Sequence, residues 1–306
     1  MMRTSNNPWL HRYAIFVALA TFLLVVAGAL VTSSDAGLSV PDWPTSFGTF
    51  HMPRMVGGVM YEHGHRMIAG MVAILTVILA LWLWRSEERR WVRRLGSLAV
   101  LVILAQAVLG GITVRFFLPA PISVAHASLA QLFFCIMVSL AVFTRAGWRW
   151  DEPKIEDPSQ PPLRRIAVAT TLVIFIQLML GAAFRHHGMG IVPHAAFALL
   201  VAVAVTWLLV RVSSDFRDEP RLKNPAILLA GLMLVQIFLG MGSYIEVLQA
   251  RHEPQPLPPM VTVTTAHVAV GALLLAVSLI LTYRVYRIVG PPGRAIADQQ
   301  VDFSAA

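Results

Sequence analysis

Four histidines lie near the start of long apolar stretches, where ionisable side chains are rare. They are His65, His126, His194 and His267. Ionisable residues within membrane spans usually face the interior of a helix bundle and serve a function. Neutral imidazole is a good ligand for heme iron, and helix bundles hold flat macrocycles between facing helices. The positions predict two iron-ligand pairs, His65 with His126 and His194 with His267. The alternative for each histidine is a packing residue held by hydrogen bonds.

Two charged side chains flank His65 in the stretch YEHGHRM, residues 61–67. Glu62 precedes His65 by three residues, so the two share a helix face if the helix begins by Glu62. There the carboxylate could act as a general base beside the heme. The alternatives are a carboxylate favoured by the helix dipole, or a hydrogen-bond partner of His65. Arg66 is expected to bond a heme propionate in a two-pronged contact, or a lipid phosphate.

Other metal and redox sites lack their ligands in this sequence. The single cysteine, Cys135, lies within an apolar stretch, so we expect it to pack, with no intramolecular disulfide and no iron–sulfur cluster. The histidines have no accompanying thiolates or carboxylate cluster, which disfavours structural zinc and di-iron sites. We interpret His63 as a polar rim residue, and His186 and His187 as loop residues with local hydrogen bonds or a propionate contact.

The composition is that of a membrane protein. Hydrophobic residues make up 57% of the 306 residues and charged residues only 13%, against roughly 25% charged in a typical soluble domain. Apolar stretches of about the ~20 residues needed to span the hydrocarbon lie at 14–32, 66–84, 96–114, 122–143, 166–184, 191–210, 226–245 and 261–283. We predict an all-α integral membrane protein with eight spanning helices, because stretches of this length without alternation do not form a β-barrel.

The basic residues alternate between loops. If the N-terminus is cytoplasmic, the outer segments hold Arg54, Arg66, Arg115, Arg185 and Arg251, and the other 19 of the 24 Lys and Arg lie inside. This bias predicts that both termini are cytoplasmic, so the net charge of +8 requires no nucleic-acid partner. The first helix is too long for a signal-peptide core. A bacterial inner membrane is the expected location.

The chain reads as two related halves. GALVTSSDAG at 28–37 aligns with GAAFRHHGMG at 181–190, QAVLGG from Gln106 aligns with QIFLGM from Gln236, and His65 and His126 align with His194 and His267. Duplicated halves of four helices keep the same orientation and are related by an axis along the membrane normal. We therefore predict two tandem four-helix bundles with pseudo-two-fold symmetry, at 1–150 and 164–306, joined by a cytoplasmic linker at 151–163. Glycines near the helix ends would allow close approach of a helix or macrocycle: Gly110, Gly111, Gly181, Gly240 and Gly242.

In order, these motifs resemble the heme A synthase family, membrane enzymes of cytochrome oxidase assembly that convert heme O to heme A. The resemblance runs through GALVTSSDAGLSVPDWP at 28–44, E-x-x-H-R at 62–66, Q-x-x-L-G-G-x-T-V at 106–114 and His126, and extends over nearly the whole chain.

The resemblance implies that the two halves of the chain have different roles. The N-terminal half would bind heme O through His65 and His126, with Glu62 as the essential carboxylate, and the C-terminal half would hold heme b through His194 and His267. The reaction would oxidise a ring methyl to a formyl group with oxygen from water. Possible partners are the farnesyltransferase that makes heme O, and a quinone or other electron acceptor.

One departure from the family concerns the first outer loop. Many members carry cysteines on both sides of the Asp-Trp-Pro motif, where this chain has Val40 and Ser46, so a disulfide cannot form there. Asp42, Trp43 and Pro44 remain and are expected to form a structured outer loop, with Trp43 as an alternative interfacial anchor.

The main rival function is a membrane b-type cytochrome that passes electrons between quinone and a partner. Such a carrier commonly stacks hemes across the membrane, whereas the four histidines here are predicted near one face, and it does not need Glu62. A transporter built from repeated bundles would leave the histidine pairing unexplained. Glu62 aligns with apolar Ile191 in the other half, which favours the N-terminal half as the place of chemistry.

Overall fold

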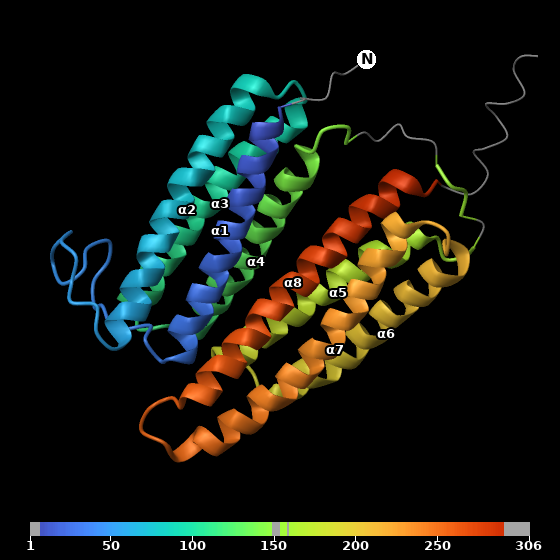
Figure 1. Ribbon diagram of the computed structural model, residues 1–306. Coiled ribbons are helices and arrows are strands. Elements are labelled where there is room, and N and C mark those ends of the chain that lie inside the picture. The colour runs from blue at the N-terminus through green and yellow to red at the C-terminus, as the bar shows by residue number, and fades with distance from the viewer. Residues whose placement is uncertain (1–6, 149–153, 158, 291–306) are drawn as a thin grey trace, which may run out of the picture.

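The computed structural model of the chain describes residues 7–148, 154–157 and 159–290 (Figure 1). Arg3, Arg149 and Arg294, which were counted toward the cytoplasmic charge, lie outside the described residues. Residues 151–153 and 158 of the predicted linker also lie outside the described residues, as do 1–6 and 149–150 of the first predicted half and 291–306 of the second.

The described residues are helical apart from loops and two isolated bridges. The helices are α1 (Pro8–Ser33), α2 (Gly58–Ser86), α3 (Arg90–Arg115), α4 (Ala120–Phe143), α5 (Leu163–Arg185), α6 (Ile191–Asp215), α7 (Pro220–Gln249), the short 3₁₀ helix η1 (Ala250–His252) and α8 (Pro258–Ile288). Eight helices in the described part are long and apolar enough to cross a membrane. The all-α class and the number of spanning helices are therefore as predicted. Several helices extend beyond the predicted apolar stretches, because polar residues continue the helix past the hydrocarbon-length segment.

Local sequence signals define several helix starts. The side chain of Asn7 accepts hydrogen bonds from the backbone N–H groups of Trp9 and Leu10, both at 3.1 Å, so it caps α1. Proline occupies the first turn of α1, α4, α7 and α8, where the missing N–H leaves no helical bond unmade.

The helices form two groups of four. In the first group α1 contacts α2 and α4, and α3 contacts α2 and α4; in the second, α5 contacts α6 and α8, and α7 contacts α6 and α8. The two groups meet through contacts of α1 with α8, α4 with α5 and α4 with α8 (Figure 1). Each group thus closes on itself, and α4 and α8 lie at the centre of the molecule.

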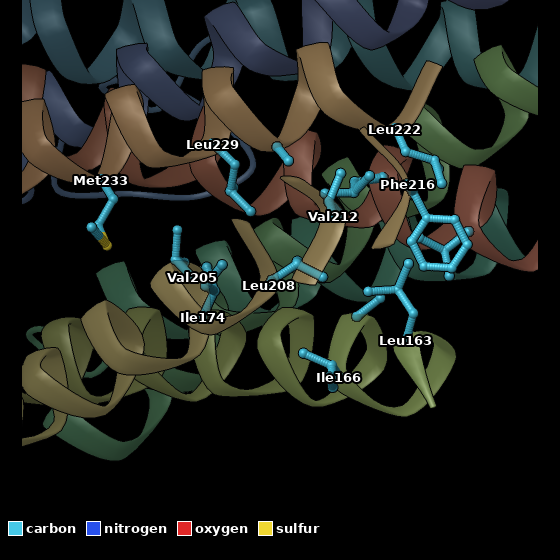
Figure 2. Close-up of a cluster of buried hydrophobic side chains, with 14 of the residues drawn as sticks. Leu163, Ile166, Ile174, Val205, Leu208, Val212, Phe216, Leu222, Leu229 and Met233 are labelled. Atoms are coloured by element: carbon cyan, nitrogen blue, oxygen red, sulfur yellow. The ribbon is translucent and has the colours of Figure 1, made fainter. Parts of the chain in front are cut away.

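Each group of helices has its own apolar core. Figure 2 shows that of α5–α8, in which side chains such as Ile174, Leu208 and Leu229 interlock. A matching core in α1–α4 includes Leu79, Phe133 and Met137. Large apolar side chains also point outward, including Leu101 and Leu199, which are 64% and 71% exposed. An outer surface this apolar fits lipid contact, where packing rather than the hydrophobic effect holds helices together.

The segment between the two groups is anchored to the second group. Ile155 donates its N–H to the carbonyl of Ile288 and accepts from the N–H of Gly290, both at 2.8 Å. Asp157 is fully buried, accepts from the N–H of Leu163 at 2.6 Å and pairs with Arg211 at 3.2 Å. The described part of the predicted linker is therefore packed structure at the end of the molecule opposite the four histidines.

Candidate functional site

The four predicted ligand histidines lie within the first ten residues of the even-numbered helices: His65 in α2, His126 in α4, His194 in α6 and His267 in α8. Because successive helices alternate in direction, these four helix starts lie at one end of the molecule (Figure 1). The predicted common depth of the histidines thus follows from the observed helix order.

Each histidine ring packs against a glycine of the preceding helix. A Cβ atom built on these glycines would lie 3.1 Å from Cε1 of His65 at Gly28 and 3.3 Å from Cε1 of His126 at Gly110. In the second group it would lie 2.9 Å from Cε1 of His194 at Gly181 and of His267 at Gly240. Contacts under 3.0 Å do not occur with real side chains, so the glycines make the room that the rings occupy.

In the second group of helices the rings of His194 and His267 lie close together in an edge-to-face arrangement. Their centroids are 6.2 Å apart and their planes are inclined by 81°. An imidazole nitrogen binds a metal ion at about 2.0–2.1 Å, so two rings that share one ion on opposite sides have centroids about 6 Å apart. The centroid distance between His194 and His267 therefore matches that of two imidazoles bound to one iron ion. In the first group, His126 contributes directly to the electrostatic environment of His65, so this pair too is brought together.

The ring nitrogens retain coordination capacity. Nδ1 of His65, His126 and His267 is buried without a hydrogen-bond partner, although buried polar atoms are normally paired. Within the described part of the chain no group of three or more His, Cys, Asp or Glu side chains is placed to hold a metal ion. Paired imidazoles in apolar surroundings therefore form the donor set, and this fits heme, whose macrocycle supplies the other four ligands.

Glu62 lies beside the first histidine pair and is held by the outer loop. Its side chain is buried, with the residue 4% exposed. One carboxylate oxygen accepts from the N–H of Val40 at 2.7 Å, and the other accepts from Nη2 of Arg66 at 2.5 Å. Among the described residues Glu62 makes no hydrogen bond to His65, so its contacts do not support the alternative that it orients this ring. Instead they hold the carboxylate in a fixed position.

Arg66 has more partners than the sequence indicated. Nη1 donates to the main-chain carbonyls of Asp42 at 2.7 Å and Thr45 at 3.1 Å, while Nη2 donates to the carbonyl of Val40 at 3.1 Å and to Glu62. The four N–H bonds of the two terminal nitrogens are thereby used. The observed role of Arg66 is to fasten the outer loop to α2, and a propionate contact remains an untested prediction.

The Asp-Trp-Pro segment forms the structured loop that was predicted. Asp42 accepts from the hydroxyl of Thr45 and from the N–H groups of Phe47 at 2.7 Å and Gly48 at 2.9 Å. The Thr45 hydroxyl, followed by the Gly48 N–H, holds the pKa of the exposed Asp42 carboxyl below its usual value. The ring of Trp43 lies on α3, where a Cβ at Gly111 would come within 2.6 Å of it. Trp43 is therefore a packing residue of this loop.

The two positions that hold cysteine in many relatives of the resembled family are buried. Val40 is 0% and Ser46 is 6% exposed. Ser46 pairs through its hydroxyl with Nδ1 of His63 at 2.9 Å, so His63, which was interpreted as a polar rim residue, has a defined partner in this loop. The loop is thus closed by hydrogen bonds.

The sequence did not reveal a polar contact between the two helix groups. Arg185 at the end of α5 donates from Nη2 to the hydroxyl of Ser33 in α1 at 2.7 Å, and the hydroxyl groups of Thr264 and Thr265 of α8 are hydrogen-bonded with the same Ser33 hydroxyl at 2.9 and 3.1 Å. The next residue, His186, is half-buried, and burial lowers its pKa to about 4, with the Arg185 cation acting in the same direction. The hydrogen bonds of Ser33 and the burial of His186 follow no periodic sequence pattern, so they become visible only when α1, α5 and α8 are packed together.

The sequence matches the family described as COX15-CtaA, cytochrome oxidase assembly protein, over residues 11–58 and 57–193. The chain belongs to this family. The match includes Glu62, His65, Arg66 and His126, and it ends one residue before His194. The resemblance seen in the motifs is therefore established for the first helix group and the start of the second.

Three relatives illustrate the similarity, each called heme A synthase. The protein from Symbiobacterium thermophilum is 32% identical over 177 residues, covering 54% of this chain and 56% of the relative. That from Lysinibacillus sphaericus is 28% identical over 185 residues, 59% of each chain. That from Exiguobacterium sibiricum is 25% identical over 187 residues, 60% of this chain and 61% of the relative. This COX15-CtaA member thus spans less than two thirds of the length of the curated relatives that it matches.

Proposed function

We propose that this protein is a heme A synthase, which oxidises the C8 methyl group of heme O to a formyl group. The observation that carries the proposal is Glu62, a buried carboxylate fixed by Val40 and Arg66 one helical turn from His65. The corresponding position in the second group of helices is Ile191. Of these two equivalent positions, the one beside His65 thus carries a proton acceptor and the one beside His194 does not.

The two histidine pairs would have different occupants. His65 and His126 would hold the iron of heme O, next to Glu62, and His194 and His267 would hold a resident heme b. The 6.2 Å ring separation and the repeated glycine contacts support the second assignment. When bound, heme b would supply one-electron redox chemistry beside the substrate site.

The reaction requires removal of both protons and electrons. Conversion of a methyl group and one water to a formyl group releases four protons and four electrons, through the alcohol and the hydrated aldehyde, which loses water. Glu62 would take protons from the methyl carbon or from the attacking water, since a positioned carboxylate is a competent general base. Arg66 would hold the Glu62 carboxylate in its orientation. The electrons would pass to a quinone or another acceptor.

The proposal includes the membrane arrangement. If α1 is equivalent to α5 and α4 to α8, a two-fold rotation converts the contact of α1 with α8 into a contact of α5 with α4. Both contacts are present, which supports a pseudo-two-fold axis between the groups along the membrane normal. The alternation of basic residues supports cytoplasmic termini, in a bacterial inner membrane, with the histidines toward the outer side. Heme O synthase is a proposed partner, because heme O is too apolar to diffuse freely in water.

The test is to express the protein with a source of heme O and to analyse the extracted hemes by chromatography and mass. Heme A and its alcohol intermediate should form. Glu62→Gln keeps the side-chain shape but not the charge, so it should retain bound heme while conversion falls by about 10²–10⁴-fold. A folded, heme-loaded protein that makes neither product would favour the rival b-type cytochrome. Normal conversion by Glu62→Gln would remove Glu62 from the mechanism.

A further inference from the structure

Two histidines of the second helix group have a glutamine side chain against them. Nε2 of Gln177 donates to the main-chain carbonyl of His194 at 3.0 Å and lies 3.2 Å from Nδ1 of the same residue. Nε2 of Gln236 lies 3.4 Å from Nε2 of His267. The main-chain carbonyls of Gln177 and Gln236 also interact favourably with the protonated rings of His194 and His267. The carbonyl of Gln106 interacts in the same way with the ring of His126.

These three glutamines occupy one repeated position. Each lies four residues before the glycine that the ring packs against, as in Gln177 and Gly181. Residues four apart lie on the same helix face, so glycine makes room for the ring and glutamine borders it. The Oε1 atoms of Gln106, Gln177 and Gln236 are buried without a partner. When the side-chain amide turns so that Oε1 faces the ring, it can accept the ring N–H that a metal-bound imidazole presents; at Gln177 this turn replaces the bond from Nε2 to the His194 carbonyl.

The fourth histidine lacks this partner. Four residues before Gly28 is Leu24, which packs against the apolar core of the first helix group. Nδ1 of His65 is buried without a hydrogen bond, as it is at His126 and His267, so this atom does not set His65 apart. The difference is that, among the described residues, the His65 ring is influenced by His126 and the Arg66 cation and not by a glutamine main-chain carbonyl.

We propose that Gln106, Gln177 and Gln236 are positioning residues for three of the iron-ligating histidines, and that Leu24 makes His65 the ligand that releases iron most readily. The second hydrogen bond of a metal-bound imidazole fixes its orientation and raises its basicity, and its loss costs about 10–100-fold in metal affinity. The His65 and His126 site would then exchange its heme, while the His194 and His267 site retains its own. This inference rests on the proposed function. It identifies the His65 and His126 site as the one that exchanges its heme from how strongly the histidines bind iron, independently of Glu62.

Carbon monoxide binding to the reduced full-length protein tests the inference, because the gas binds only where the iron gives up a ligand. Protein loaded with heme O and heme b in detergent should bind carbon monoxide at the heme of His65 and His126 alone. Leu24→Gln should lower that affinity by about 10–100-fold, whereas Leu24→Met, an apolar replacement of similar volume, should leave it unchanged. Gln177→Leu or Gln236→Leu should open the second heme to the gas.

The outcomes separate the inference from the function on which it rests. Equal carbon monoxide affinity in the Leu24→Gln and Leu24→Met proteins, or an unreactive second heme in both the Gln177→Leu and Gln236→Leu proteins, overturns the inference alone. If His65→Ala leaves the number of bound hemes unchanged, the proposed heme sites themselves are wrong. Gln177→Leu is independent of any folding defect that Leu24→Gln causes.

Discussion

At Glu62 each carboxylate oxygen has one donor, and the two donors come from different parts of the chain. Val40 belongs to the outer loop and Arg66 to the next turn of the same helix. The pairing with Arg66 follows from the spacing of four residues along a helix, and sequence alone could have suggested it. The Val40 contact could not be predicted, because it depends on the path of an irregular loop.

His186 gives a residue-scale prediction for pH dependence. Its pKa is about 4 in the folded protein because the ring is buried, against about 6.5 unfolded. The unfolded chain therefore binds more protons between these values, so stability falls as the pH is lowered from about 6.5 to 4. His186→Gln should weaken this fall, measured as the apparent melting temperature in detergent across that range. The exposed His252 provides the control variant, His252→Gln, and parallel curves for His186→Gln and the unmodified protein would contradict the assignment.

At the scale of helices, the number of elements was predictable and their ends were not. Eight apolar stretches predicted α1–α8, because each exceeds the length that the hydrocarbon demands. Hydropathy fails at the ends: α3 begins at Arg90, six residues before the stretch predicted from 96, because arginines stay helical while their charges reach water. The contacts between glycines and histidines required the helix packing, although the aligned motifs had already singled out most of the glycines.

The glycine contacts lead to an element-scale prediction on α7. A Cβ at Gly240 would lie 2.9 Å from Cε1 of His267, whereas a Cβ at Gly231 on the same helix would meet nothing within 4 Å. Gly240→Ala should displace the ring and lower heme retention at the second site by about tenfold or more. Gly231→Ala should leave heme content unchanged and stabilise the helix slightly. The measurement is the heme-to-protein ratio after purification, and equal ratios in the two variants would refute the packing argument.

At the scale of the whole molecule, the halves were predictable from their repeated motifs, but their mode of contact was not. Ser33, Arg185, Thr264 and Thr265 join α1, α5 and α8 by hydrogen bonds. Single serines and threonines in membrane helices are common, so the sequence carries no signal that these four meet. Which face a helix turns toward lipid and which toward a neighbour becomes visible only when all eight are packed.

The orientation in the membrane gives a prediction for the whole chain. In a Cys135→Ser background, Phe50→Cys in the outer loop and Asp218→Cys between α6 and α7 place one exposed thiol at each end. An impermeant maleimide should label Phe50→Cys in intact spheroplasts and Asp218→Cys only after lysis, because the basic loops remain in the cytoplasm. The reverse pattern would invert the proposed topology.

The hydrogen bonds around Glu62 affect which substitutions the loop between α1 and α2 can accept. The main-chain N–H of Val40 donates to the Glu62 carboxylate. The guanidinium of Arg66 donates to the main-chain carbonyls of Val40, Asp42 and Thr45. Every residue type supplies a carbonyl, and every residue type except proline supplies an N–H. Substitutions at these loop positions can therefore accumulate while the carboxylate keeps its surroundings, provided that the backbone path survives. By this reasoning, Val40 and Ser46 can stand where the resemblance led us to expect a cysteine pair without changing the surroundings of the Glu62 carboxylate.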